Sequence, residues 1–221
     1  LYARFFTKAL SKCGYFDIKE PFAGLLTQGM VCHETYQDKN GKWLFPDDVN
    51  KEKNGYVNVK TGEEVVVGRS QKMSKSKKNV VDPSYIVDVY GADTARLFML
   101  SDSPPERDLE WSEAGVEGAW RYVNRLWRMV AQFKNDVGTG SINEPKEISD
   151  ELLKIRKLTH KTIEGVTSDL DGFHFNKALA RVRELTNSLS SIDVKSPDGA
   201  YVFLEAVKNS TLLLSPMIPH I

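Results

Sequence analysis

Cysteine and long apolar runs are both scarce in this sequence, and neither sign of charge dominates. Only two cysteines occur among 221 residues, Cys13 and Cys32, with no CxxC pair or nearby histidine pair, so reduced thiols are favoured over a disulfide. The longest apolar runs, such as residues 211–214, are far too short to span a bilayer, and no signal segment opens the sequence. Because 30 Lys and Arg balance 30 Asp and Glu, a nonspecific nucleic-acid coat is excluded, and any polyanion must bind at a local patch.

The first third of the chain mixes helix and strand signals. Apolar residues at helical spacing from Tyr2 to Leu10 predict a helix that Gly14 ends. The run from Leu25 to Val31 is short and apolar, which predicts a buried strand of a parallel sheet. Three short strands are then predicted at 43–45, 56–59 and 64–67, between the turn signals Asn40-Gly41, Asn54-Gly55 and Thr61-Gly62. They indicate a small β-rich insertion.

The rest of the chain is predicted to be helical. Asp82-Pro83 opens a helix that Gly91 ends, and a second short helix follows up to Leu100. Four amphipathic helices are then predicted at 112–137, 149–169, 174–192 and 198–214, with connections at Gly138-Thr139-Gly140, Asp171-Gly172 and Ser196-Pro197. Short connections between such helices are typical of an antiparallel bundle. The predicted fold class is therefore mixed and mainly α.

A basic stretch between these two parts carries the clearest chemistry. Residues 68–81 hold five basic residues and no acid, and they include Lys72-Met73-Ser74-Lys75-Ser76. Two lysines on a loop can grip different oxygens of a triphosphate and stabilise the pyrophosphate as charge develops on it. The hydroxyls of Ser74 and Ser76 can donate to phosphate or hold the turn, while Met73 can pack the loop onto the domain. The alternative is a solvated lysine-rich surface loop.

The pentapeptide at 72–76 is, letter for letter, the second signature of class I aminoacyl-tRNA synthetases. From average residue frequencies it occurs by chance in roughly one in ten thousand chains of this length. Its flanks resemble the leucyl-tRNA synthetase family, with the bacterial type as the nearest match. The matching phrases are Leu25 to Val31, Gly91 to Leu100 and Leu109 to Ala119.

This resemblance implies a function and a division of the chain. The family activates leucine with ATP and Mg²⁺ and transfers it to tRNA-Leu, in the cytoplasm, with no membrane partner and as a monomer. Residues 1–35 and 68–82 would be the closing part of a Rossmann-like nucleotide-binding domain, and 36–67 its β-rich insertion. Residues 83–111 would form the connecting region that contacts the tRNA stem. Residues 112–221 would be the helical anticodon-binding domain, cut short.

The resemblance also assigns site residues. Lys75 would bind ATP phosphates, Lys72 would stabilise the departing pyrophosphate, and Met73, Ser74 and Ser76 would complete the ATP-binding loop. Arg121, Arg125 and Arg128 share one helix face and could contact tRNA phosphates, with a solvated face as the equal alternative. Packing of Trp120 and Trp127 inside the bundle is favoured over the alternative, stacking on bases. No metal site is predicted, and the histidines His160, His174 and His220 are interpreted as structural.

Several features of the family are missing from this sequence. The His-Ile-Gly-His signature, the editing domain and the C-terminal extension do not occur, so we expect a fragment that does not activate leucine alone and whose loop is mobile or held in a non-productive pose. Lys77-Lys78-Asn79 stands where many class I enzymes have lysine-glycine-asparagine. The alternatives are a stand-alone tRNA-binding or interaction module, and a fragment of the valyl or isoleucyl enzyme.

Overall fold

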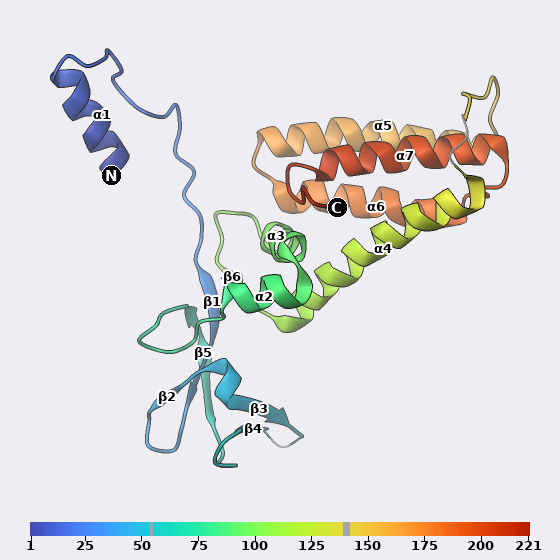
Figure 1. Cartoon of the computed structure of the whole chain (residues 1–221). Helices are drawn as coiled ribbons and strands as arrows, with labels where there is room; N and C mark the ends of the chain where they lie inside the picture. Colours follow the sequence, from blue (N-terminus) through green and yellow to red (C-terminus); the bar gives the residue numbers. More distant parts are fainter. Residues whose placement is uncertain (54, 139–141) are drawn as a thin grey trace.

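The N-terminal helix lies apart from the rest of the protein. A computed structural model describes residues 1–53, 55–138 and 142–221. In it, α1 (Tyr2–Lys12) is followed by Gly14 at a φ of 82°, as predicted, but none of its residues is buried. Figure 1 shows α1 joined to the remainder by a long extended segment. Within that segment Glu20 forms ion pairs with Arg4 and Lys8, which hold the segment against the helix.

The prediction of a buried strand at 25–31 is wrong. Leu25 is 91% exposed, and only Val31 of this run belongs to a strand. A strand that is apolar on both faces needs neighbouring strands and covering helices, and the described residues provide neither beside 25–30. Among the described residues, the hydrogen bonds that fix this segment lie at its end, where the Gly29 N–H donates to the Pro105 carbonyl at 2.8 Å and the Met30 N–H to Asp108 Oδ1 at 2.7 Å.

A small sheet is built around the strand that follows. β1 (Val31–Gln37) lies between β2 (Trp43–Leu44) and β5 (Val66–Lys72), antiparallel to both, and pairs in parallel with β6 (Leu109–Glu110) near its start. A second pair of antiparallel strands, β3 (Val49–Glu52) and β4 (Gly55–Asn58), follows a 3-10 turn over Pro46–Asp48. Tyr36, Leu44 and Val65 form the small core of this region.

The strand predictions are partly confirmed. The strands predicted at 43–45 and 56–59 appear as β2 and β4, whereas β3 was not foreseen. The third predicted strand, at 64–67, extends as β5 into the stretch predicted to be a loop, so residues 68–72 are strand. Gly41 and Gly62 have positive φ values of 78° and 69°, as their turns require. Asn54 of the remaining turn lies outside the described residues.

The helical prediction is confirmed closely. Its helices are α2 (Pro83–Tyr90), α3 (Ala92–Ser101), α4 (Glu113–Val137), α5 (Asp150–Asp171), α6 (Phe175–Ser188) and α7 (Pro197–Leu214), with a 3-10 turn at Leu189–Ser191. Side-chain oxygens of Asp82, Ser112, Ser149 and Ser196 accept N–H groups of the first turns of α2, α4, α5 and α7, which explains where these helices start. Thr139 and Gly140 of one predicted connection lie outside the described residues.

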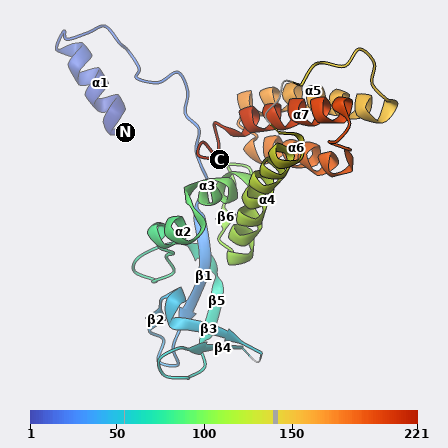
Figure 2. The same ribbon diagram turned by 45° about the vertical axis from the view of Figure 1, so that its right-hand side comes forward.

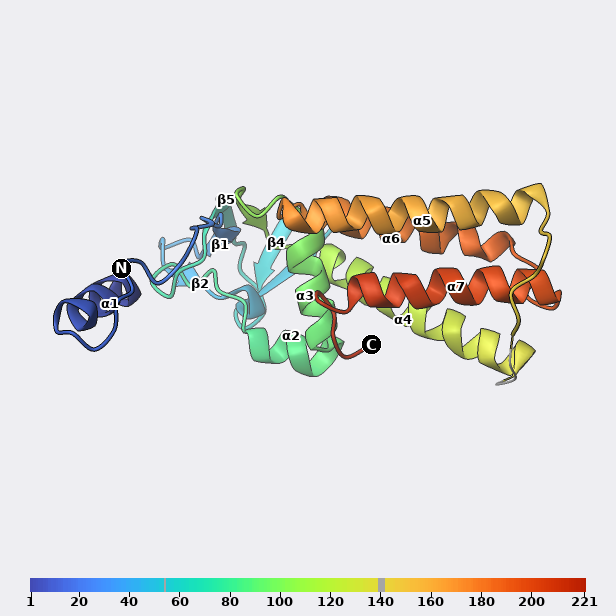
Figure 3. The ribbon, with the colours of Figure 1, turned by 90° about the horizontal axis from the view of Figure 1, so that it is seen from above.

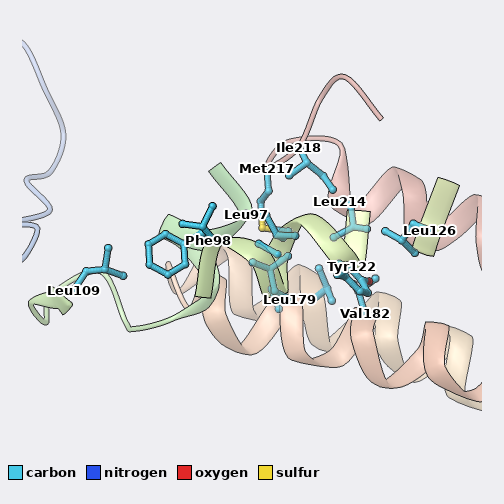
Figure 4. Close-up of a cluster of buried hydrophobic side chains, with 14 of the residues drawn as sticks. Leu97, Phe98, Leu109, Tyr122, Leu126, Leu179, Val182, Leu214, Met217 and Ile218 are labelled. Carbon is cyan, nitrogen blue, oxygen red and sulfur yellow. The ribbon is translucent and has the colours of Figure 1, made fainter. Parts of the chain in front are cut away.

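The long helices share one principal core. α5, α6 and α7 lie side by side, while α4 crosses beneath them and contacts α3 (Figures 1, 2 and 3). Figure 4 shows how side chains of α3, α4, α6 and α7 meet in this core: Leu97, Phe98, Tyr122, Leu126, Leu179, Val182 and Leu214. No helix among the described residues has the length and apolar character needed to cross a membrane.

The buried face of α4 differs from the predicted one. Val116, Ala119, Tyr122, Leu126 and Phe133 are buried, whereas Trp127 is 65% exposed and Trp120 is also exposed. The expectation that both tryptophans pack inside the bundle is therefore wrong. An apolar stripe at helical spacing that contains both tryptophans predicted a different buried face, but the face of α4 that meets α6 and α7 is set by Tyr122 and Leu126.

The last residues of the chain close back onto α3. Arg96 donates to the backbone carbonyls of Met217 at 2.7 Å and Pro216 at 3.2 Å. The two carboxylate oxygens of Asp93 contact the N–H and the Nδ1 of His220, each at 2.8 Å. These contacts join positions about 120 residues apart in sequence, and they seat Met217 and Ile218 in the principal core.

Candidate phosphate-binding loop

The chain leaves the sheet directly after the first lysine of the signature. Lys72 is the last residue of β5 and stands opposite Cys32 of β1. The Met73 N–H then donates to the Val31 carbonyl at 3.0 Å, which is the final backbone bond to β1. Lys72 therefore has a backbone fixed by the sheet, whereas Lys75 lies in the turn that follows.

A buried asparagine fixes the shape of this turn. The side chain of Asn79 is fully buried, and its Oδ1 accepts the Ser74 N–H at 2.9 Å. Its Nδ2 lies 3.1 Å from the carbonyls of His33 and Gln71 and 3.4 Å from that of Lys72. One amide thus joins both ends of the loop to β1 and β5. The sequence interpretation missed this role, although an asparagine in a polar loop commonly binds nearby backbone groups.

The two serines of the signature differ in their surroundings. Ser74 Oγ accepts the Lys77 N–H at 3.3 Å and lies 3.3 Å from Ser76 Oγ. Ser76 is exposed, and the Lys78 N–H donates to the Lys75 carbonyl at 3.3 Å to close the turn. Of the two roles considered for these hydroxyls, Ser74 holds the turn, whereas Ser76 is accessible.

Lys78 occupies a backbone conformation that favours glycine. Its φ is 55°, in the left-handed region, where a side chain costs about 1 kcal/mol or more. This explains physically why a glycine suits that position. Its Nζ lies 5.0 Å from the centre of the Phe45 ring, a cation–π contact that ties the loop to the segment before β3.

The loop cations have no acidic partners among the described residues. None of Arg69, Lys72, Lys75, Lys77 and Lys78 forms an ion pair there, and Lys77 Nζ instead contacts Gln71 Oε1. Lys72 and Lys75 are exposed, and Met73 is half-buried. Unpaired cations on a turn of fixed shape are suited to binding a polyanion.

A separate cavity lies away from the two loop lysines. It has a volume of about 830 Å³ and is lined by β1, β5, the β3–β4 hairpin and residues 110–114, but not by Lys72 or Lys75. Burial lowers the pKa of His33 there and raises the pKa of Tyr36, whose hydroxyl donates to Glu34 Oε2 at 3.0 Å. Its lining mixes acids with Arg69 and Lys51, so it is less suited to phosphate than the loop is.

The three arginines predicted to bind tRNA are not equivalent. Arg121 and Arg125 line one surface hollow together with Arg183 of α6, which the sequence interpretation missed. Arg128 is not part of this hollow, and its Nε donates to the Asn124 carbonyl of its own helix at 3.2 Å. Within the described residues, no three His, Cys, Asp or Glu side chains are grouped to hold a metal ion.

Two family models match the chain. Residues 48–112 match the class I tRNA synthetases for I, L, M and V, and residues 153–221 match the anticodon-binding domain of tRNA ligases. Together these matches cover more than half of the chain. The first includes the loop, and the second includes α6 and α7.

Curated relatives are similar over the whole chain. A leucine--tRNA ligase of Paramagnetospirillum magneticum is 58% identical over 100% of this chain and 25% of its own length. The leucine--tRNA ligase of Rhodospirillum rubrum is 51% identical, over 100% of this chain and 26% of its own length. The chain thus spans about a quarter of the length of these relatives.

Solved structures agree with this similarity. The leucyl enzyme agnB2 LeuRS of Agrobacterium radiobacter K84, solved with tRNA and LeuAMS, matches 99% of this chain and 24% of its own, with a TM-score of 0.70 and 28% identity. Methionyl-tRNA synthetase of Mycobacterium tuberculosis shares the fold, with a TM-score of 0.59 and 12% identity over 86% of this chain and 69% of its own. The chain therefore belongs to the class I tRNA synthetases and corresponds to one region of the leucine--tRNA ligases.

Proposed function

We propose that this chain supplies the ATP-phosphate loop and a tRNA-binding helical region to an enzyme that activates leucine and transfers it to tRNA-Leu. The observation that carries the proposal is the turn at 72–79: the buried amide of Asn79 fixes its backbone, and its lysines form no ion pair with any described residue. The 58% identity to a leucine--tRNA ligase supports the choice of amino acid over the valyl and isoleucyl alternatives. Cytoplasmic location and a monomeric enzyme remain part of the proposal.

The residues of the loop fit the phosphates of ATP. ATP supplies the α-phosphorus that the leucine carboxylate attacks, with pyrophosphate as the leaving group. Lys72 extends from the fixed end of β5 and Lys75 from the turn, so the two ammonium groups can reach different phosphate oxygens. Ser76 offers an accessible hydroxyl, while Met73 and Ser74 hold the loop against the sheet. Residues 68–81 contain no carboxylate that could bind Mg²⁺. Mg²⁺ therefore enters the proposal as the counter-ion that ATP itself carries.

The division of the chain is part of the same proposal. Residues 1–35 and 68–82 are assigned to the end of a Rossmann-like nucleotide-binding domain, 36–67 to an insertion, 83–111 to a stem-contact region and 112–221 to an anticodon-binding domain. The parallel pairing of β1 with β6 joins the end of the proposed stem-contact region to the proposed nucleotide-binding part, and parallel strands are typical of nucleotide-binding domains. β1 and β5 each cross a proposed boundary, so the insertion and the nucleotide-binding part share one sheet.

The test is leucine-dependent ATP–pyrophosphate exchange in a full-length enzyme that contains these residues. Lys72→Ala and Lys75→Ala are each expected to lower kcat by about 10²-fold, because each removes a cation that stabilises the developing charge. Lys39→Ala is the matched control, since Lys39 is an exposed lysine that pairs with Glu63 at 2.5 Å and not with a loop residue. A loss of less than threefold in both loop variants would refute the assignment.

A second candidate function is tRNA binding without catalysis. It is favoured by the arginine hollow on α4 and α6, which does not involve the loop. The chain of 221 residues contains no His-Ile-Gly-His signature, so it is expected to bind tRNA but to show no pyrophosphate exchange by itself. Leucine-dependent exchange by this chain alone would contradict that expectation.

A further inference from the structure

The lysines of the loop divide into two pairs by their exposure. Lys72 and Lys75 are exposed, whereas Lys77 and Lys78 are half-buried. Lys77 contacts a glutamine side chain of the neighbouring strand β5. Lys78 reaches a different part of the protein, the segment between β2 and β3, where its Nζ lies 5.0 Å from the centre of the Phe45 ring. Lys78 therefore joins the loop to the region of residues 36–67.

The backbone of Lys78 belongs to the same turn as Lys75, the lysine proposed to bind ATP phosphates. The Lys78 N–H donates to the Lys75 carbonyl at 3.3 Å. The next residue, Asn79, is fully buried and is bound to the carbonyls of β1 and β5. The position of the Lys78 side chain is thus coupled to that of Lys75 through one short stretch of backbone.

The contact with Phe45 depends on a lysine in a backbone conformation that favours glycine. Lys78 has a φ of 55°, where a side chain is disfavoured. A glycine, which stands here in many class I enzymes, adopts this conformation without strain but has no ammonium group to place over a ring. The cation–π contact offsets the strain that the lysine introduces. The link between loop and ring is therefore a property of this sequence.

The surroundings of Phe45 favour a cation. The ring is 42% exposed, and the Phe45 carbonyl accepts the Asp48 N–H at 3.0 Å, which fixes its backbone at the start of the 3-10 turn. The carboxylate of Asp48 pairs with Lys60 at 2.7 Å. The pKa of Asp48 is lowered first by this bond to Lys60 and, to a smaller extent, by the charge of Lys78. Asp48 thus attracts the ammonium group of Lys78 while it is paired with another lysine.

We propose that Lys78 is a positioning residue, which rests on Phe45 and holds the turn of Lys75 in place before ATP arrives. This inference rests on the proposed function, since it concerns the same loop. A turn that is already ordered costs less to bind, and the benefit is the same for bound ATP and for the transition state. Loss of the contact therefore raises the KM for ATP and leaves kcat nearly unchanged, whereas loss of Lys75 lowers kcat.

The test is ATP–pyrophosphate exchange at varied ATP concentration, in a full-length enzyme that contains these residues. Phe45→Leu and Lys78→Met are each expected to raise the KM for ATP about three- to fivefold, the size of a surface cation–π contact, with kcat within about twofold. Because both residues act through one contact, the double variant is expected to match either single variant. Lys78→Arg and Phe45→Tyr each keep a cation over a ring and are expected to restore the KM.

Lys51→Met is the matched control. Lys51 Nζ lies 5.7 Å from the centre of the Tyr56 ring, so the substitution removes a contact of the same kind. This contact joins β3 to β4 and does not involve the loop. The KM for ATP is therefore expected to stay unchanged in Lys51→Met.

Three outcomes would overturn the positioning role. An unchanged KM in Phe45→Leu, or effects of the two substitutions that multiply in the double variant, would show that the contact does not act on the loop. A large fall of kcat in Lys78→Met, with Phe45→Leu unaffected, would show that Lys78 itself binds phosphate. An equal rise of the KM in Lys51→Met would indicate a general loosening of residues 36–67.

A failure of this inference and a failure of the proposed function give different results. If Lys75→Ala lowers kcat but Phe45→Leu leaves the KM unchanged, the positioning role alone is wrong. If Lys75→Ala leaves kcat unchanged, the proposed function is wrong, and hydrogen exchange of the Lys78 amide in the 221-residue chain still tests the contact. Exchange that is faster in Phe45→Leu than in Lys51→Met supports a turn held by the ring, and equal rates contradict it.

Discussion

Replacement of Asn79 tests whether one buried amide determines the shape of the loop. Asn79→Ala removes the acceptor of the Ser74 N–H and the donor shared by the carbonyls of His33, Gln71 and Lys72. A hydrogen bond contributes about 0.5–1.5 kcal/mol net, so loss of these contacts predicts a decrease of about 2–4 kcal/mol in the free energy of unfolding. The contacts join β1, β5 and the loop, so both the local and the global stability are expected to fall.

Asn79→Asp refines this prediction. The aspartate keeps an oxygen for the Ser74 N–H but places a second oxygen against three carbonyls, so its loss of stability is expected to equal or exceed that of the alanine variant. Urea unfolding gives the global change, and hydrogen exchange of the Ser74 amide reports the local one. Ser76→Ala is the control, because Ser76 is exposed and its loss is expected to cost less than about 0.5 kcal/mol.

The result that refutes the reasoning is specific. If Asn79→Ala costs less than about 0.5 kcal/mol and the Ser74 amide exchanges at an unchanged rate, water replaces the lost contacts without penalty. The amide would then not determine the loop conformation. The geometry at Lys72 and Lys75 would have to come from the sheet alone.

Three further predictions concern the same region. In a Phe45→Leu background, which already lacks the cation–π contact of Lys78, Lys78→Gly is expected to raise the unfolding free energy by about 1 kcal/mol, because glycine adopts the left-handed backbone conformation without strain. An unchanged urea midpoint would contradict this prediction. Burial lowers the pKa of His33 below 6.5, so unfolding takes up a proton and the unfolding free energy falls as the pH drops from 6.5 toward the folded pKa. An NMR titration of the ring with a midpoint at or above 6.5 would refute it. Gly68→Ala would place a Cβ 2.4 Å from the hydroxyl of the buried Thr35 on β1, so the free energy of unfolding is expected to fall by about 2 kcal/mol, measured by thermal unfolding. Gly24→Ala is the control, because a Cβ there would meet open space, and its effect is expected to be about zero.

Local signals were sufficient for the helices. The cap at Ser149 and the proline at 197 follow from bonds and φ values within one helical turn, so the starts of α5 and α7 could be predicted to within a residue or two. The apolar run from Leu25 could not be placed, because a buried strand depends on neighbours that sequence periodicity does not specify. The face of α4 was misjudged for the same reason, since Trp127 stays 65% exposed at the edge of the face that the other helices cover.

The candidate site likewise combines residues that could be predicted from the sequence with residues whose roles only the folded structure reveals. The lysines at 72 and 75 could be singled out from a contiguous motif, and their assignment to ATP phosphates stays a prediction. Asn79 and Arg183 could not be found in that way. The first acts on carbonyls as far away as His33, and the second joins Arg125 only because α6 packs against α4. Residues whose roles depend on distant chain segments require the folded structure.

The docking of the C-terminal residues onto α3 has a consequence during synthesis on the ribosome. Asp93 and Arg96 leave the ribosome long before residues 216–220, which are their partners. At about 5–20 residues per second, the interval is on the order of ten seconds. Until then the surface of α3 that receives Ile218 stays open to water and to chaperones, so the helical region is expected to complete its fold only after residues 216–220 have emerged, rather than helix by helix.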